Sequence, residues 1–266
     1  MTHHIVEAID LHYTYPDGTV GLNGVSFRVS HGESVALVGE NGAGKSTLLL
    51  HLNGCLTAAQ GTLRIGDYPL NSKNLNEVRR SLGMVFQNPD DQLFMPTVFD
   101  DVAFGPLNFG MTKDEAKQTV LRALETAGVG HLAKRPPYKL SQGEKRSVSI
   151  ATVLAMSPDI LVLDEPTSSL DPRSRRRLIE LLKTFEHTKI IATHDLDMAL
   201  ELCERTIVLH GGCVTADAST QEILQDEAFL HANSLEKPLC MQKISLWDPN
   251  KIPHHTHHHS DYTHKK

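Results

Sequence analysis

The chain of 266 residues has little of what marks membrane-spanning, secreted or nucleic-acid-binding proteins. No stretch reaches the roughly 18 consecutive apolar residues that cross a bilayer, and residues 1–7 lack the apolar core of a signal peptide. Lys and Arg number 26 against 32 Asp and Glu, and no basic run is interleaved with aromatic residues, which argues against nucleic acid as a partner. Any membrane role is therefore expected to be peripheral.

Cysteine is also sparse. The four cysteines, Cys55, Cys203, Cys213 and Cys240, are scattered without Cys-x-x-Cys spacing. We interpret them as reduced thiols of a cytosolic protein and do not expect a structural zinc site. The longest basic cluster, residues 173–177, is interpreted as a solvated helix face.

Hydrophobic periodicity indicates strands that alternate with helices, preceded by an antiparallel hairpin layer. This alternation predicts an α/β fold with a mostly parallel core sheet covered on both faces. An interrupted helical stretch from residue 88 predicts an inserted helical subdomain. The expected strands are 24–29, 34–38, 160–163, 189–192 and a hairpin over 206–217; the expected helices are 45–52, 98–104, 112–127, 141–156, 171–185 and 220–225.

A glycine-rich loop joins the strand at 34–38 to the helix at 45–52. Residues 39–46 match the G-x-x-x-x-G-K-[ST] pattern in the strand-loop-helix context that it requires. Glycines let backbone N–H groups wrap the phosphates of a nucleotide, Lys45 adds a positive charge, and the Ser46 hydroxyl is a ligand for Mg²⁺. The expected ATP-binding residues of the loop are Gly39, Glu40, Asn41, Gly42, Ala43, Gly44, Lys45, Ser46 and Thr47.

Two adjacent carboxylates, Asp164 and Glu165, follow an apolar strand, at the sheet edge where ligands of α/β folds bind. Because side chains alternate along a strand, Asp164 is expected to face Mg²⁺ and Glu165 to polarise the attacking water as general base. His194 follows the next apolar strand; a lone histidine is usually structural, but this position predicts contact with the γ-phosphate. Lys45, Glu165 and His194 are therefore the predicted catalytic residues.

The most informative stretch is Leu-Ser-Gln-Gly-Glu-Lys-Arg at 140–146. Ser141 and Glu144 predict a capping box, and Gly143 leaves backbone N–H groups open at a positive helix end that suits a phosphate. Alone, the heptapeptide is more often an ordinary helix start, because capping boxes are common. Its place between the phosphate loop and the acidic strand favours phosphate binding.

In this order, the motifs together with Gln87 and the Ser-Ser-Leu-Asp run at 168–171 resemble the ATP-binding-cassette (ABC) family over about residues 5–230. The resemblance implies a P-loop NTPase fold in a single domain at 1–240. Its parts are a RecA-like core at about 1–87 and 157–218, a helical subdomain at about 88–156 and a short extension at about 219–250. A histidine-rich tail at 251–266 is expected to be disordered.

The resemblance further implies a head-to-tail homodimer with ATP at its interface. Each nucleotide would be held by the phosphate loop of one chain and by Ser141, Gln142, Gly143 and Glu144 of the other. Gln142 departs from the family's usual glycine, and we expect it to change affinity or rate without abolishing activity.

Further site residues follow from the same resemblance. Tyr15, with Tyr13 as a substitute, is implied to stack on adenine. Gln87 is implied to join Ser46 and Asp164 around Mg²⁺. Asp171 is implied to communicate across the dimer interface.

The residues that follow Gln87 resemble the energy-coupling-factor (ECF) branch of the transporters, in Asn-Pro-Asp-Asp-Gln-Leu-Phe at 88–94 and in the segment 97–106. The resemblance implies a groove for a helix of a transmembrane coupling subunit, with Gln87, Asp90 and Asp91 as coupling residues and basic groups of the partner opposite the aspartates. A plain loop before an acidic helix start is the alternative.

Three stretches, at 51–54, 146–156 and 235–239, look most like the ATPase of cobalt and nickel importers. This implies an ATPase at the cytoplasmic face of the cell membrane, with the coupling subunit and a metal-binding membrane subunit as partners. The imidazoles at 254–259 suit such metals, and a purification tag is the simpler alternative. The alternatives are an ECF ATPase shared by vitamin importers and a soluble ABC ATPase, which would carry a coiled-coil insertion, tandem cassettes or a basic arm.

Overall fold

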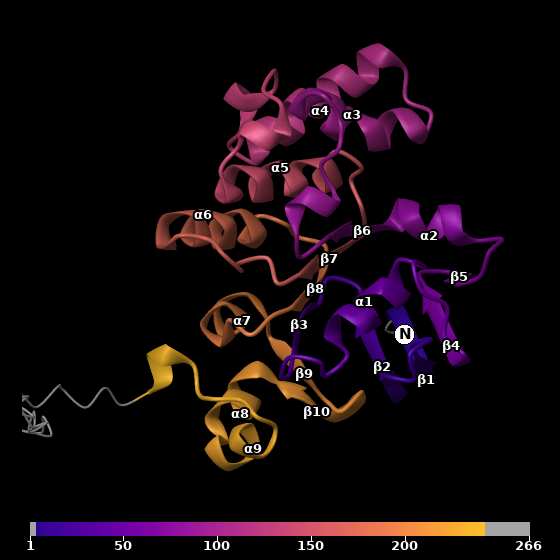
Figure 1. Ribbon diagram of the computed structural model, residues 1–266, viewed down its shortest axis with the longest axis vertical. Helices are drawn as coiled ribbons and strands as arrows, with labels where there is room; N and C mark the ends of the chain where they lie inside the picture. Colours follow the sequence, from indigo (N-terminus) through magenta and orange to yellow (C-terminus); the bar gives the residue numbers. More distant parts are fainter. Residues whose placement is uncertain (1–3, 243–266) are drawn as a thin grey trace, which may run out of the picture.

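The computed structural model describes residues 4–242. Two β-sheets lie beside each other, and a group of helices forms one end of the molecule (Figure 1). Within the described part of the chain, no helix is both long and apolar enough to cross a bilayer.

The larger sheet has six strands in the order β10-β9-β3-β8-β7-β6. Neighbouring strands from β9 to β6 are parallel, and β10 is antiparallel to β9 at the edge. Every residue of β7 is buried, as expected for a parallel strand that is covered on both faces. The strands are β3 (Ser34–Val38), β6 (Leu82–Val85), β7 (Ile160–Asp164), β8 (Thr188–Ala192), β9 (Arg205–His210) and β10 (Cys213–Ser219).

The smaller sheet is antiparallel, with the order β2-β1-β4-β5. Its strands are β1 (His4–Thr14), β2 (Val20–Ser30), β4 (Gln60–Ile65) and β5 (Tyr68–Pro69). The turn at residues 15–18 joins β1 to β2, which confirms the expected hairpin layer.

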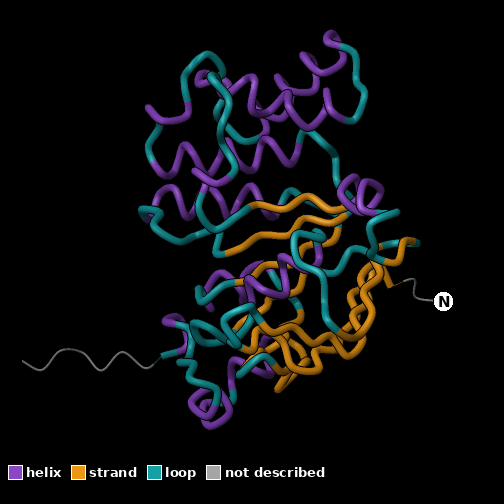
Figure 2. Tube along the Cα trace, turned by 45° about the vertical axis from the view of Figure 1, so that its right-hand side comes forward, coloured by secondary structure: helices purple, strands orange, loops and turns teal. Residues whose placement is uncertain are grey.

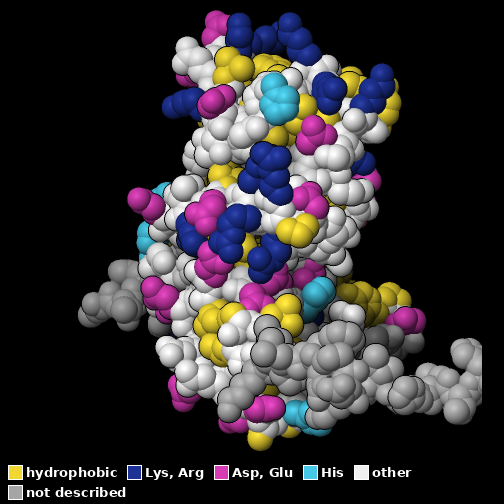
Figure 3. Space-filling view, turned by 90° about the vertical axis from the view of Figure 1, so that its left-hand side faces the viewer, with side chains coloured by type: hydrophobic (Ala, Val, Ile, Leu, Met, Phe, Trp, Pro, Cys, Tyr) yellow, Lys and Arg dark blue, Asp and Glu magenta, His cyan; other side chains and the backbone are white. Residues whose placement is uncertain are grey.

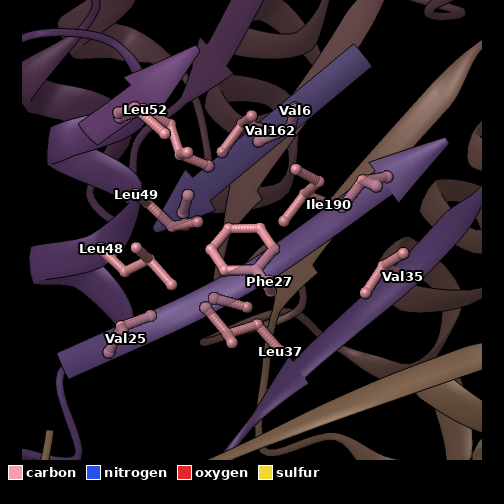
Figure 4. Packing of buried hydrophobic residues seen from close by; sticks show 14 of the residues in the cluster. Val6, Val25, Phe27, Val35, Leu37, Leu48, Leu49, Leu52, Val162 and Ile190 are labelled. Carbon is pink, nitrogen blue, oxygen red and sulfur yellow. The ribbon is translucent and has the colours of Figure 1, made fainter. Parts of the chain in front are cut away.

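One hydrophobic core joins both sheets to α1 (Lys45–Leu52). Phe27 of β2 lies between the leucines of α1 and the core-sheet residues Leu37 and Ile190 (Figure 4). This packing fixes the start of α1, and with it the phosphate loop, at the carboxyl end of β3.

A second core covers the other face of the large sheet. Residues of four helices belong to it, α6 (Pro172–Lys183), α7 (Leu196–Leu202), α8 (Thr220–Gln225) and α9 (Glu227–Ala232), together with Ile150 and Val153 from the helical end. The helix α2 (Leu75–Ser81) connects the two sheets ahead of β6.

A third core belongs to the helical end, where α3 (Val98–Asn108), α4 (Lys113–Thr126) and α5 (Gln142–Leu154) pack together (Figure 2). Thr112 with Glu115 and Ser141 with Glu144 form capping boxes at the starts of α4 and α5, and the second confirms the capping box predicted from the sequence. The α/β fold, the mostly parallel sheet, the antiparallel layer and the helical insertion are thus confirmed.

The expected elements differ from the structure mainly at their ends and in the short pieces. The strand at 34–38 and the helices at 45–52 and 220–225 have the predicted bounds, whereas α2, β4, β5, β6 and α9 were not expected. The four cysteines carry free thiols. The predicted tail at 251–266 lies outside the described residues, and the subdomain boundaries stay a prediction.

The interpretation of residues 173–177 as a solvated face is wrong for one residue. Arg173, Arg176 and Arg177 are exposed, but Arg175 is half-buried and its guanidinium pairs with Asp195. The sequence pattern on α6 alone gives no sign of this pair, because Asp195 lies on another element.

Candidate nucleotide-binding site

A cavity of about 310 Å³ opens over the phosphate loop at the carboxyl ends of the core strands. It brings together most of the residues that the sequence assigns to the nucleotide within one chain, although Gly39, Glu40, Ala43 and Asp164 are not in its lining. Its lining consists of Tyr15, Thr19, Val20, Gly21, Asn41, Gly42, Gly44, Lys45, Ser46, Thr47, Gln87, Glu165 and His194.

Lys45 is almost wholly buried beneath the phosphate loop. Its Nζ donates hydrogen bonds to the carbonyl oxygens of Gly39 (2.7 Å) and Glu40 (3.0 Å), and it lies 4.0 Å from Oε1 of Glu165. Burial lowers the pKa of Lys45, while Glu165 and Asp164 oppose that shift. An ammonium group has three hydrogens, so one donor remains for a phosphate.

Gly39 and Gly44 show why the loop needs glycine. Both have positive φ, 156° and 104°, and a Cβ would meet the backbone oxygen of Leu209 at 2.2 Å or of Gly21 at 2.5 Å. The loop therefore lies closer to neighbouring backbone than any side chain permits.

Asp164 ends β7 below the cavity, and the residues around it fit a magnesium ion. Asp164 is 5 % exposed, its Oδ1 has no hydrogen-bond partner among the described residues, and the Ser46 hydroxyl hydrogen-bonds the carboxylate through its other oxygen. Burial raises the pKa of Asp164 despite that bond and the nearby Lys45. One buried carboxylate beside a hydroxyl suits Mg²⁺, which takes its remaining ligands from phosphates and water.

Glu165 and His194 form a close pair. Nδ1 of His194 lies 2.7 Å from Oε1 of Glu165, and the backbone N–H of His194 donates to Oε2 at 3.3 Å. Burial raises the pKa of Glu165, although His194 and Lys45 act in the opposite direction. A buried carboxylate with a raised pKa is a stronger base than an exposed one.

The prediction that strand alternation orients Glu165 is wrong. Strand alternation does not aim this side chain, because Glu165 follows β7 in a left-handed conformation with φ of 45°. Its backbone N–H is held by the carbonyl oxygen of Ala192 at 2.8 Å. The turn, and not the pleat of the strand, brings Glu165 to His194.

The other wall of the cavity comes from residues that sequence analysis did not find. Thr19, Val20 and Gly21 line it from β2 and the turn before it. At Gly21 a Cβ would meet Thr47 at 2.9 Å and the Tyr15 ring at 3.1 Å. No motif marks this glycine; only the packing of β2 on α1 reveals it.

Tyr15 lines the cavity, and its hydroxyl hydrogen-bonds Oγ1 of Thr47 at 2.9 Å. Tyr13, the expected substitute, is not among the lining residues. Its ring packs edge-on between Tyr15 and His51, with centroid distances of 5.0 and 4.8 Å. Tyr13 thus packs against the Tyr15 ring without lining the cavity.

The segment 141–144 lies outside this cavity. Glu144 accepts from both the N–H and the hydroxyl of Ser141, and the N–H of Glu144 donates to the Ser141 hydroxyl. Gly143 packs against α6, where a Cβ would meet Oγ of Ser174 at 2.7 Å. That hydroxyl donates to Asp171, the N-cap of α6, at 2.6 Å.

Helix α5 also holds the backbone that follows β6. Arg146, 3 % exposed, donates to the carbonyl oxygens of Phe86 (2.6 Å) and Gln87 (2.5 Å). The side chain of Gln92 accepts from the N–H of Phe86 and donates to Ser149 and Thr152 on α5. Residues 86–92 therefore form one unit with α5.

Asp90 takes part in this contact in a way that the sequence did not predict. Its Oδ1 accepts from Nζ of Lys145 at 2.6 Å, so the charge that was expected to meet a partner's basic group already has a partner within the chain. Asp91 makes only a weak contact with Asn88, at 3.3 Å. The two aspartates are thus not equivalent.

Comparison with known proteins agrees with this geometry. The family model described as "ABC transporter" matches residues 22–168. A putative ABC transporter ATP-binding protein of Geobacter sulfurreducens is 63% identical over 242 residues, which cover 91% of this chain and 97% of the relative. The energy-coupling factor transporter ATP-binding protein EcfA of Methanocaldococcus jannaschii is 44% identical over 248 residues, covering 91% and 89%.

Solved structures give the same result. The protein cbiO1 from Clostridium perfringens, described as part of the ABC transporter complex cbiONQ, has a TM-score of 0.76 and 37% identity, covering 86% of this chain and 94% of that one. The ATP-binding cassette MJ0796, solved as a dimer bound to ADP and Pi, has a TM-score of 0.73 and 29% identity, covering 81% and 98%. The chain therefore belongs to the ABC transporter family, as an ATP-binding subunit whose relatives include energy-coupling-factor ATPases.

Proposed function

We propose that this subunit energises an ECF-type importer of cobalt or nickel ions from the cytoplasmic face of the membrane, by binding and hydrolysing ATP between two copies of the chain. The observation that supports hydrolysis between two copies is that the predicted nucleotide contacts fall in two separate places on one chain. The cavity gathers the phosphate loop, Glu165 and His194, whereas the helix end at Ser141 lies outside it.

Within one chain, the nucleotide contacts follow from the lining of the cavity. Tyr15 stacks on the base, and Lys45 with the N–H groups of 39–47 binds the phosphates. Ser46, Gln87 and Asp164 would hold Mg²⁺, which when bound neutralises charge on the phosphates. Glu165 accepts the proton of the attacking water, and His194 orients this carboxylate through its contact of 2.7 Å.

The second copy completes the site. Ser141, Gln142, Gly143 and Glu144 lie at the start of α5, where the positive end of the helix favours a phosphate. The structure of MJ0796 as a dimer bound to ADP and Pi supports this arrangement by similarity. Asp171, at the start of the neighbouring helix α6, is the candidate for communication between the copies.

The docking surface for the membrane partner is proposed at Asp90, Asp91, Phe94, Phe104 and Leu107. The three apolar side chains are 63%, 44% and 43% exposed, and the two phenyl rings stack edge to face at 5.0 Å. An exposed aromatic pair beside acidic groups suits an amphipathic helix with basic residues. Gln87 links this surface to the cavity, because it lines the cavity and its carbonyl is held by Arg146.

Glu165→Gln tests the catalytic assignment. We expect ATP binding to persist, steady-state phosphate release to stop, and an ATP-bound dimer to accumulate in size-exclusion chromatography. Glu33→Gln is the matched control, since Glu33 is a paired surface carboxylate outside the cavity. Wild-type turnover by Glu165→Gln would refute the assignment.

The cargo needs a separate test, because the relatives named EcfA are energy-coupling factor ATPases whose names give no cargo, and they also fit the second candidate, an ATPase shared among vitamin-binding subunits. Co-purification with the membrane partners, followed by uptake of Co²⁺, Ni²⁺ or vitamins into vesicles, separates the two. ATP-driven uptake of a metal ion supports the proposal, and uptake of vitamins alone contradicts it. Comparison of chains with and without residues 251–266 tests the tail.

A further inference from the structure

Arg175 and Asp195 form a bidentate ion pair that connects α6 to the N-cap of α7. Nε and Nη2 of Arg175 donate to the two carboxylate oxygens of Asp195 at 2.6 and 2.7 Å. The side chains are 28% and 18% exposed, so water only partly screens the pair. Burial disfavours the charge on Asp195, but the hydrogen bonds from Arg175 prevail and lower its pKa. Bidentate pairs of this kind fix orientation as well as distance.

The acidic end of the pair is adjacent to His194. Asp195 directly follows that residue, caps α7 by accepting from the N–H of Met198 at 3.0 Å, and donates its own N–H to Thr193 at 2.9 Å. The backbone path of His194 is thereby fixed on its carboxyl side.

The basic end of the pair sits one turn into α6. That helix begins at Asp171, and its Ser174 touches Gly143 of α5. Because the two hydrogen bonds of Arg175 fix both the distance and the orientation of Asp195, a shift of α6 on dimerisation would move Asp195 with it.

We propose that Arg175 is a positioning residue for catalysis, which couples the start of α6 at the dimer interface to the placement of His194 against Glu165. The inference depends on the catalytic roles proposed above. Arg175 touches neither nucleotide nor water, and it acts through Asp195.

The neighbouring Arg176 provides a matched control. It lies on the same helix and also bridges to α7, but its partner Glu201 is in the last turn, away from His194. Arg176 also pairs with Glu180 on its own helix at 3.2 Å, and basic and acidic side chains lie mixed on the face of the molecule shown in Figure 3. Both arginines connect α6 to α7, but of the two only Arg175 pairs with the residue next to His194, which lines the cavity.

The test compares Arg175→Gln, Arg175→Lys and Arg176→Gln in the full chain, by steady-state ATPase activity and thermal denaturation. We expect Arg175→Gln to lower kcat roughly 10- to 100-fold, the cost of a small misplacement at a reacting centre. The KM for ATP should stay within about twofold, since binding energy comes from the loop and Tyr15. Arg175→Lys should restore activity in part, because an ammonium cannot form the fork.

Arg176→Gln should leave kcat within about twofold of wild type. If both glutamine variants lower kcat equally, or if Arg175→Gln raises KM as much as it lowers kcat, the positioning role is refuted. Should Arg175→Gln fail to fold, Asp195→Asn replaces it: the amide still caps α7, and kcat should fall similarly.

Glu165→Gln in the same assay distinguishes an error in the catalytic assignment of Glu165 from an error in the role of Arg175. Turnover by that variant would overturn the catalytic assignment and the present inference with it. An inactive Glu165→Gln beside a fully active Arg175→Gln would overturn only the role of Arg175.

Discussion

Replacement of Gly143 by alanine separates two roles that one glycine can have. In the structure Gly143 packs on α6, where a Cβ would lie 2.7 Å from Oγ and 3.2 Å from Cβ of Ser174. The proposed dimer also places it against the nucleotide of the other chain. Gly143→Ala should therefore disturb both the fold and turnover.

The size of the first effect follows from these distances. Alanine is the better helix former by roughly 0.5 to 1 kcal/mol, yet overpacking costs about 1 to 3 kcal/mol. The net loss should be about 1 kcal/mol, or a fall in Tm of roughly 2 to 4 °C for a chain of this size. Removal of Oγ by Ser174→Ala leaves only the contact at 3.2 Å, so Gly143→Ala should cost almost nothing in that background.

The assay is a double-mutant cycle of Gly143→Ala and Ser174→Ala, with Tm from calorimetry and turnover from phosphate release. We expect the double variant to regain the Tm of Ser174→Ala but to stay at least about tenfold below it in turnover, as for loss of a phosphate-site contact. A Tm deficit that Ser174→Ala does not relieve would refute the packing argument. Recovery of turnover together with Tm would show that Gly143 acts only within its own chain.

Three further predictions concern the cavity and the docking surface. Tyr15→Ala should raise the KM for ATP about tenfold with little change in kcat, whereas Tyr15→Phe keeps the stacking ring and most of the affinity; equal KM values for both would exclude stacking. Because burial raises the pKa of Asp164 above its usual 3.8, the folded chain binds that proton more tightly than the unfolded chain, and stability falls as the pH rises through the raised pKa. Asp164→Asn should thus raise the Tm of the nucleotide-free protein at pH 8, by a margin that shrinks toward pH 4; a margin independent of pH contradicts this. Asp90→Lys should lose about 1 kcal/mol of stability, because it sets two ammonium groups together, whereas Asp91→Lys should fold normally and still weaken co-purification with the membrane partner. Unchanged co-purification of Asp91→Lys would argue against the docking surface.

Local signals were enough to predict the parts of the site that lie on a continuous segment. The phosphate loop, the helix that follows it and the capping box at Ser141 each depend on residues within a few positions of one another, and the structure has them as expected. The strand before Asp164 could be predicted as well, because a short run of apolar residues between two acids favours a buried strand.

Contacts between distant segments could not be predicted in this way. Arg175 meets Asp195 across 20 positions and Lys145 meets Asp90 across 55, and each pair is set by how helices pack. Gly21 belongs to the site only because β2 lies against α1. Short pieces such as α2 and β5 were missed because they are too brief to show a period.

The way Arg146 holds residues 86–92 has a consequence for how this protein can diverge. Arg146 donates to the main-chain oxygens of Phe86 and Gln87, so it recognises the path of the backbone and is indifferent to the side chains on it. Side chains of this segment that do not reach α5, such as Asp91, can therefore be exchanged to suit a different membrane partner while the contacts of Arg146 stay intact, whereas Asp90 and Gln92 themselves bond to α5. Exposed side chains that face a partner can thus change without altering the contacts that join residues 86–92 to α5, which come from Arg146, Gln92 and the pair of Asp90 with Lys145.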